Sequence, residues 1–381
     1  MRITLGKQLL LALLSAVLLA WWWPEAARRA AFLGKAFLLF LEWFAPVIVF
    51  CTVFTAIAGA DARQNFAVRR ILLMYFCSMI GASLTAVTVG LVWPGGLVLP
   101  EAVEAADFTP RSNVFSGLIL IGLMAAGIGL GLLMRNAGTA GARLPAIAKK
   151  FNHFGLRLIM ILLPLGIFGI CCRVFVNYDA AVFSFALSIT LYLVASSLAV
   201  GFLVNPAVFF IFTGRSPWAS LRDALRLSAF PALLSRSSIV NLPVNLAAAD
   251  RLGVPKKIAG LALPIGAVLD MPGAVVSIAG MTLCGVTAGG QPDLMTLLII
   301  AAGSTGCALL ASGIPSGSAV LLPAMLNIAG ADPAVCSLVL AVYFMAGLLQ
   351  DAVGTALNSS SDLFFALSER RATPDRKDLA P

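Results

Sequence analysis

Four polar residues near the C-terminus share one face of an otherwise apolar segment. At spacings of i, i+4, i+7 and i+11 they are Asp351, Thr355, Asn358 and Asp362. At about 100° per residue, this spacing places their side chains in one narrow stripe of a helix. A carboxylate inside a membrane helix costs roughly 2.5–3.5 kcal/mol or more unless it meets a partner, a cavity or an ion. The stripe therefore predicts a cation and ligand site, and the alternative is a structural hydrogen-bond network between helices.

A second polar interruption lies in an earlier apolar segment, at Asp270-Met271-Pro272-Gly273. Proline and glycine release backbone carbonyls from the helical ladder, and those oxygens can coordinate a hard cation such as Na⁺. Asp270 would add charge to such a site and Met271 a soft contact. A simple proline kink is the alternative.

Arg236, in the cluster Ser235–Pro243, is the only cation among these polar clusters. An unpaired buried arginine would be unfavourable, which favours an ion pair with one of the carboxylates. A contact with an anionic group of a substrate is the other interpretation.

The composition predicts a membrane protein. Of 381 residues, 60% are hydrophobic and 11% are charged, and apolar stretches long enough to cross a bilayer core of about 30 Å recur along the chain. A helical bundle satisfies the backbone in such segments. The net charge of +9 lies mainly between the spans, as in cytoplasmic loops, which argues against a nucleic-acid partner. The 7 cysteines form no C-x-x-C pair, so neither a metal site nor a disulfide framework is expected.

The spans that must position these residues can be placed approximately. We expect helices at about 9–23, 31–60, 70–93, 115–134, 155–176 and 181–213. The Lys and Arg residues of the loops place the N-terminus in the cytoplasm. The basic loop after the fourth span carries Arg135, Arg143, Lys149 and Lys150.

From about Pro217 onward the apolar segments are broken by clusters of Ser, Gly, Pro and Asn. The clusters at 235–243 and 311–318 are flanked by stretches too short for two full spans, so each predicts a re-entrant helical hairpin. A longer helix follows each hairpin, at about 258–282 and 333–368. A repeated hairpin-plus-helix unit is typical of secondary transporters, whose site lies between the repeats.

In this order, the features resemble the dicarboxylate/amino-acid:cation symporters, the glutamate-transporter homologues. The resemblance covers nearly the whole chain. The segment Phe37–Phe50 is similar to the family's second span, the serine-rich cluster ending in Leu242-Pro243 to its first hairpin, and Gly313-Ile314-Pro315-Ser316-Gly317 to its second. The last helix shares the family's Asp, Thr, Asn and Asp pattern.

The resemblance implies roles for individual residues. Asp351 would bind the amino group of the substrate and Asn358 its carboxylate, with Thr355 and Gly354 lining the pocket. Arg236 adds a possible substrate contact from the first hairpin. Backbone groups at the two hairpin tips would close on the substrate at Ser237, Ser238, Gly313, Ile314 and Pro315. One Na⁺ would be held by the Gly266 carbonyl, Asp270, Met271, Asn358 and Asp362.

The resemblance also implies an architecture. We expect an all-α membrane protein of about eight transmembrane helices, two re-entrant hairpins and inverted repeats. Scaffold helices would occupy 1–68 and 112–178, and a moving transport domain 69–96 and 179–368, followed by a cytoplasmic tail at 369–381. The resemblance further implies a homotrimer in a bacterial inner membrane, with both termini cytoplasmic.

Three departures from the family pattern bear on the substrate and the ions. Gly354 stands where transporters of acidic amino acids carry an arginine, which removes a partner worth about 1.5–3 kcal/mol for a side-chain carboxylate. The family's Asn-Met-Asp-Gly-Thr is here Asp270-Met271-Pro272-Gly273-Ala274. In the third span, Met79 and Ile80 stand about where Thr and Ser ligands are expected.

These departures favour a Na⁺ symporter for a small neutral amino acid that lacks one of the usual Na⁺ sites and needs no other cofactor. A dicarboxylate or acidic substrate is the first alternative. Proton coupling through a desolvated Asp270 also stays open. A passive channel is an alternative from another class, and an enzyme is not expected, because no catalytic triad is apparent.

Overall fold

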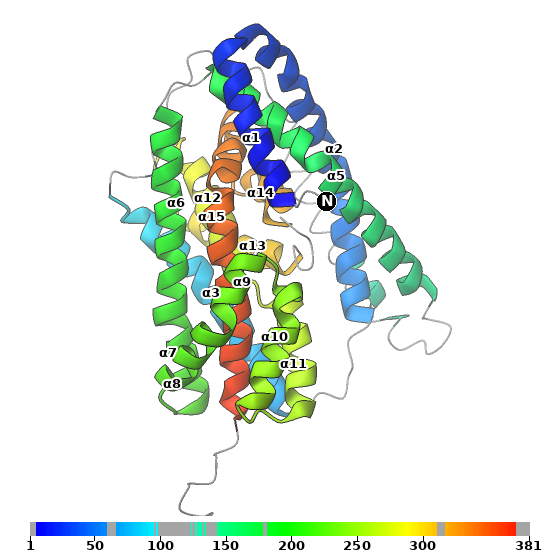
Figure 1. The fold of residues 1–381 in the computed structure, drawn as a ribbon, viewed down its shortest axis with the longest axis vertical. Helices are drawn as coiled ribbons and strands as arrows, with labels where there is room; N and C mark the ends of the chain where they lie inside the picture. The colour runs from blue at the N-terminus through cyan, green and yellow to red at the C-terminus, as the bar shows by residue number, and fades with distance from the viewer. Residues whose placement is uncertain are drawn as a thin grey trace, which may run out of the picture.

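The computed structural model describes residues 5–58, 66–94, 97, 143–177, 181–310 and 317–370, with single positions between 123 and 134. Every regular element in these ranges is a helix, so the described part is all-α as predicted (Figure 1). The longer helices are α1 (Leu5–Trp22), α2 (Pro24–Ala58), α3 (Phe66–Leu91), α5 (Arg143–Asn177), α6 (Ala181–Ala199), α7 (Asn205–Thr213), α10 (Ser238–Arg251), α11 (Lys256–Leu269), α12 (Pro272–Thr287), α13 (Leu294–Leu310), α14 (Gly317–Ile328) and α15 (Pro333–Ala366). The short ones are η2 (Val200–Val204), α8 (Trp218–Ala224), η3 (Leu225–Ala229), α9 (Phe230–Ser235) and η4 (Leu367–Glu369).

Several of these helices are long and apolar enough to cross a membrane. Within the described residues, three pass on length and composition: Phe66–Leu91, Val182–Thr213 and Lys256–Thr287. Two further segments, Leu338–Gly347 in α15 and Leu349–Glu369 from α15 into η4, pass together as one bent span. α2 and α5, of 35 residues each, also exceed the roughly 20 residues that a span requires.

α1, α2 and α5 form one packed group along one side of the molecule (Figure 1). α2 and α5 cross with their backbones in contact, because glycines meet at the crossing. A Cβ on Gly34 would lie 2.6 Å from the backbone nitrogen of Ile170, and one on Gly169 would meet the backbone of Gly34. Small residues at a crossing are the usual means of close helix approach in membranes.

The remaining helices form a second group around α15. α3, α6 and α12 pack against one another and on α15, and α13 and α14 pack together on α12. The first hairpin rises through α8, η3 and α9 in the view of Figure 1 and returns downward as α10, with α11 beside it. The predicted first hairpin is therefore present, with its tip at Arg236 and Ser237.

The predicted interruption between α11 and α12 is also present, at Asp270 and Met271. Pro272 begins α12, and a residue that precedes proline is disfavoured in the helical conformation. Met271 accordingly has φ −120° and ψ 50°, and Asp270 has φ −84° and ψ 88°. The chain thus leaves the helical ladder at the one carboxylate of this span.

Two sequence-based boundaries are wrong. α5 begins at Arg143 rather than near residue 155, so Lys149 and Lys150 lie on a helix and not in a loop. α2 begins at Pro24 rather than at residue 31. Only Trp23 separates it from the end of α1 at Trp22. In both cases the helix begins several residues before the apolar run does. Its first turns contain polar residues, because a helix need not be apolar outside the bilayer core. The expected fourth span lies mostly outside the described residues.

Candidate functional site

The tip of the first hairpin reaches α15 through an ion pair. The Nη2 and Nε atoms of Arg236 donate to Oδ2 of Asp351 at 2.7 and 3.1 Å. The pair is partly open, with 26% of the Arg236 side chain and 34% of the Asp351 side chain exposed. The structure thus identifies Asp351 as the carboxylate that pairs with Arg236, an ion pair of the kind that the sequence favoured.

The backbone at the tip is arranged to present this arginine. Arg236 has φ 52°, the only positive φ of a non-glycine residue in the described part of the chain, and its N–H donates to the carbonyl of Ala232 at 2.8 Å. Left-handed backbone costs an L-residue roughly 1–2 kcal/mol. Ser237 is extended and caps α10, its hydroxyl accepting from the N–H of Val240 at 3.3 Å. Retained strain of this kind points to a functional position.

A polar cluster fixes both arms of the hairpin to α15. Ser359 lies at its centre, 0% exposed, and its carbonyl accepts from the Ser228 hydroxyl and the Asn245 amide, each at 2.9 Å. The Asn241 amide donates to the Ser359 hydroxyl at 2.7 Å. The cluster satisfies polar groups that would otherwise be unfavourable at membrane depth. It therefore fixes the hairpin next to the polar stripe.

Asn358 joins the stripe to the break between α11 and α12. Its Oδ1 accepts from the N–H of Gly273 at 2.7 Å, and its Nδ2 donates to the sulfur of Met271 at 3.3 Å. Gly273 can approach only because it has no side chain: a Cβ there would overlap the backbone of Gly354. Met271 thus contacts the amide of Asn358 at the break between the two helices.

Asp270 and Asp362 lie together at the break, both 0% exposed. Oδ2 of Asp270 accepts from the Ser361 hydroxyl at 2.6 Å. Its Oδ1 and both carboxylate oxygens of Asp362 have no hydrogen-bond donor among the described residues. Two buried carboxylates with three unpartnered oxygens are strongly unfavourable unless a cation or a proton neutralises them.

Gly266 and Tyr75 complete this pocket. A Cβ on Gly266 would lie 2.7 Å from the hydroxyl oxygen of Tyr75 and closer still to Oδ1 of Asp362, so a larger residue would displace these two side chains. The Gly266 carbonyl accepts the N–H of Asp270 at 2.8 Å and keeps a second lone pair. The Tyr75 hydroxyl lies 3.4 Å from the carbonyls of Ala262 and Asp362.

The oxygen atoms around Asp362 are suitable ligands for a hard cation. Carboxylate and carbonyl oxygens are the ligands that such ions prefer, and the set contains no imidazole or thiolate. The unpartnered oxygens therefore fit a monovalent or small hard cation.

The other predicted residues fall as follows. Thr355 in the stripe and Gly354 next to it are buried, and Thr355 is 8% exposed. Ser238 is buried at the hairpin tip. Gly313, Ile314 and Pro315 lie outside the described residues, so the second hairpin is seen only in its arms α13 and α14.

Sequence reasoning missed several residues of this region. The Tyr75 hydroxyl lies 3.4 Å from the backbone carbonyl of Asp362, and the Ser361 hydroxyl donates to the Asp270 carboxylate. The Gln350 amide donates to the hydroxyl of Ser277 on α12 at 2.7 Å. The serine run 359–361 beside Asp362 was the available signal. No sequence signal pointed to Tyr75, because a single tyrosine in an apolar span is expected to be a packing residue.

Together, the broken spans, the hairpin and the intramembrane carboxylates define a multi-pass membrane transporter. The family model of the sodium:dicarboxylate symporter family matches residues 5–371, nearly the whole chain. The chain therefore belongs to that family, as the motifs indicated. Its members carry out sodium-coupled symport of dicarboxylates or amino acids.

Proposed function

We propose that this protein takes up a small neutral amino acid together with Na⁺. The observation that carries the proposal is the Arg236–Asp351 pair beside Gly354. One cation and one anion match the carboxylate and the ammonium of a zwitterion. Gly354 offers no third charge to a side-chain carboxylate.

In this proposal, the substrate divides the ion pair. Its ammonium takes a place at Asp351 and its carboxylate faces Arg236, with Thr355 on the same face of α15 and Ser237 and Ser238 at the hairpin tip. Asn358 is within the same stripe and can turn its amide to the substrate when Met271 releases it. Gly313, Ile314 and Pro315 would close the pocket from the second hairpin.

Na⁺ is the coupling ion at Asp270 and Asp362, with the Gly266 carbonyl, Met271 and Asn358 as its neighbours. The three carboxylate oxygens without a donor support this assignment. Two carboxylates would attract one Na⁺ strongly and still leave a negative charge, so a proton on one of them is compatible with the site. Proton-coupled transport is accordingly the alternative that the same residues allow.

Movement would follow the two packed groups of helices. α1, α2 and α5 pack mainly with one another, which supports a fixed scaffold of residues 1–68 and 112–178. Residues 69–96 and 179–368 would carry the substrate across the membrane in an elevator motion. A homotrimer in a bacterial inner membrane is the assembly that the resemblance implies.

A dicarboxylate is the second candidate, favoured by the family's own description. Arg236 would then bind one carboxylate, and Asp351 would have to be neutral or displaced. The test is uptake of labelled alanine, serine, aspartate and succinate into proteoliposomes, with Na⁺ and pH gradients imposed separately. Na⁺-driven uptake of alanine or serine supports the proposal, and uptake confined to aspartate or succinate would overturn it.

A further inference from the structure

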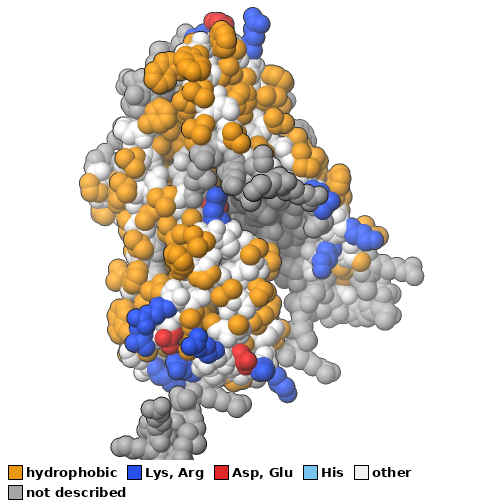
Figure 2. Space-filling model, viewed as in Figure 1, with side chains coloured by type: hydrophobic (Ala, Val, Ile, Leu, Met, Phe, Trp, Pro, Cys, Tyr) orange, Lys and Arg blue, Asp and Glu red, His pale blue; other side chains and the backbone are white. Residues whose placement is uncertain are grey.

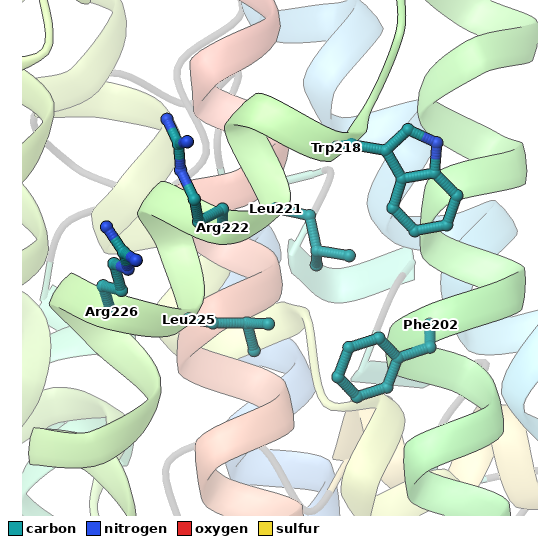
Figure 3. A pocket seen from close by; sticks show the side chains of 6 residues that line it. All are labelled: Phe202, Trp218, Leu221, Arg222, Leu225 and Arg226. Carbon is teal, nitrogen blue, oxygen red and sulfur yellow. The ribbon is translucent and has the colours of Figure 1, made fainter.

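Two adjoining cavities open between the α6–α7 span and the first hairpin, beside the part of α15 that carries Ser360 and Ser361. The more enclosed cavity, of about 240 Å³, has α15 as its inner wall. The more open one, of about 340 Å³, is lined by Phe202, Trp218, Leu221, Arg222, Leu225 and Arg226 (Figure 3). Phe202, Leu221 and Leu225 line both, so the two form one continuous groove.

Local helix geometry makes room for this groove. η2 on one wall and η3 on the other are both π-helical segments, in which an extra residue per turn displaces the side chains. Small residues add space: Gly201 lies on η2 and Ala229 on η3, and a Cβ on Gly201 would meet nothing closer than Leu357 at 3.5 Å. Single-turn π segments occur frequently at functional sites.

The surface around the groove is apolar and exposed. On the α6–α7 side, Leu203 is 68% exposed, Phe210 56% and Ile211 75%. In a membrane transporter such a face lies against lipid chains. Figure 2 shows hydrophobic side chains over this side of the molecule, with basic side chains gathered at the end where α7 and α8 lie.

The outer end of the groove is basic and carries an interfacial aromatic residue. Arg222 and Arg226 are exposed, and Arg222 meets only Asp223, at 3.7 Å, among the described residues. Trp218, 59% exposed, faces Phe202 across the groove (Figure 3). Tryptophan prefers the headgroup level, and arginine binds phosphate through a planar fork of donors.

We infer that this groove binds an anionic glycerophospholipid. The phosphate of its headgroup lies at Arg222 and Arg226, and one acyl chain enters between Phe202, Leu221 and Leu225. Each basic residue near an anionic lipid surface contributes about 1 kcal/mol, which favours anionic over zwitterionic headgroups. Apolar burial along the groove holds the chain.

The test uses brominated lipids, which quench nearby tryptophans. The protein is reconstituted in phosphatidylcholine vesicles with rising fractions of brominated phosphatidylglycerol or brominated phosphatidylcholine. The Trp218 signal is taken as the difference between the native protein and Trp218→Phe. We expect half-maximal quenching of Trp218 at a roughly tenfold lower fraction of phosphatidylglycerol.

Two variants separate headgroup from chain. Arg222→Gln with Arg226→Gln abolishes the preference for phosphatidylglycerol, whereas Arg215→Gln with Arg251→Gln, the same charge loss outside the groove, retains it. Gly201→Leu fills the groove and lowers quenching by phosphatidylglycerol. Equal quenching by both lipids in the native protein, or no quenching of Trp218 at all, would overturn the inference.

Discussion

Arg236 can either bind the substrate carboxylate or compete with the substrate. Its guanidinium already pairs with Asp351, the carboxylate to which the substrate ammonium would bind. If it supplies the partner of the substrate carboxylate, it contributes a charge-assisted hydrogen bond of about 1.5–3 kcal/mol. If it only occupies Asp351, it competes with the substrate. The two roles have opposite effects on affinity.

Arg236→Gln tests this point. We expect KM for a neutral amino acid to rise about 10- to 100-fold, because each 1.4 kcal/mol of lost binding is a factor of ten. Initial rates of uptake over a range of substrate concentrations measure the change. Asp351→Asn should also raise KM. A fall in KM in Arg236→Gln would mean that the arginine competes with substrate.

Gly354→Arg tests the origin of specificity. A Cβ at residue 354 meets backbone atoms of Gly273 no closer than 3.5 Å, so the first atom of the new side chain fits. The added guanidinium should improve the uptake of aspartate relative to alanine by about tenfold or more. Competition of unlabelled aspartate against labelled alanine measures this shift, and an unchanged ratio would count against the position assigned to residue 354.

At the scale of elements, the break between α11 and α12 fixes the geometry of the site. It brings Asp270 out of the helical ladder, and it places the N–H of Gly273 on Asn358. The contact of α12 with α15 depends on Gly273, because a side chain at this position would overlap the backbone of Gly354.

Gly273→Ala should therefore destabilise the protein by about 1–3 kcal/mol, since its Cβ overlaps the backbone of Gly354. Gly354→Ala is the matched control. Its Cβ meets only ordinary contacts, and alanine favours a helix over glycine by about 1 kcal/mol. Thermal unfolding in detergent compares the two. Equal midpoints would contradict the tight crossing.

The sequence predicts elements of this kind better than it predicts contacts. Proline, glycine and serine clusters located the first hairpin and the break at Asp270, because those residue types disturb the helical ladder wherever they stand. The pairs Arg236–Asp351 and Ser361–Asp270 join residues 115 and 91 positions apart, and no local pattern specifies them. Tyr75 was missed for the same reason.

At the scale of the whole molecule, charge is distributed unevenly along the long axis. Basic side chains gather at the end formed by α7, α8 and the last turns of α15, where Arg70 pairs with Glu369 at 2.6 Å and Arg370 with Asp223 at 3.3 Å (Figure 2). Trp21 and Trp22 end α1 and Trp23 follows it, and all three are more than two-thirds exposed. The distribution of Lys and Arg predicts that the basic end is cytoplasmic.

Single cysteines introduced at Arg251 and Glu25 test this orientation. Both positions are exposed. Glu25 lies in the first turn of α2 and Arg251 ends α10, and these two helix ends lie at opposite ends of the molecule (Figure 1). An impermeant maleimide should label Arg251→Cys only in inside-out vesicles and Glu25→Cys only in right-side-out vesicles. The native protein, whose described cysteines are buried or half-buried, gives the background. Reversed labelling would contradict the predicted orientation.

The most direct test of the account is Na⁺-driven uptake of a labelled neutral amino acid by the protein and by Asp362→Asn. Removing one buried carboxylate from the cation site should raise the Na⁺ concentration for half-maximal uptake at least tenfold, or abolish uptake. Asp250→Asn is the same change at an exposed position that forms an ion pair with Lys256 at 3.6 Å, and it should leave the Na⁺ dependence unaltered. An unchanged Na⁺ dependence in folded Asp362→Asn would contradict the assignment of Na⁺ to this site.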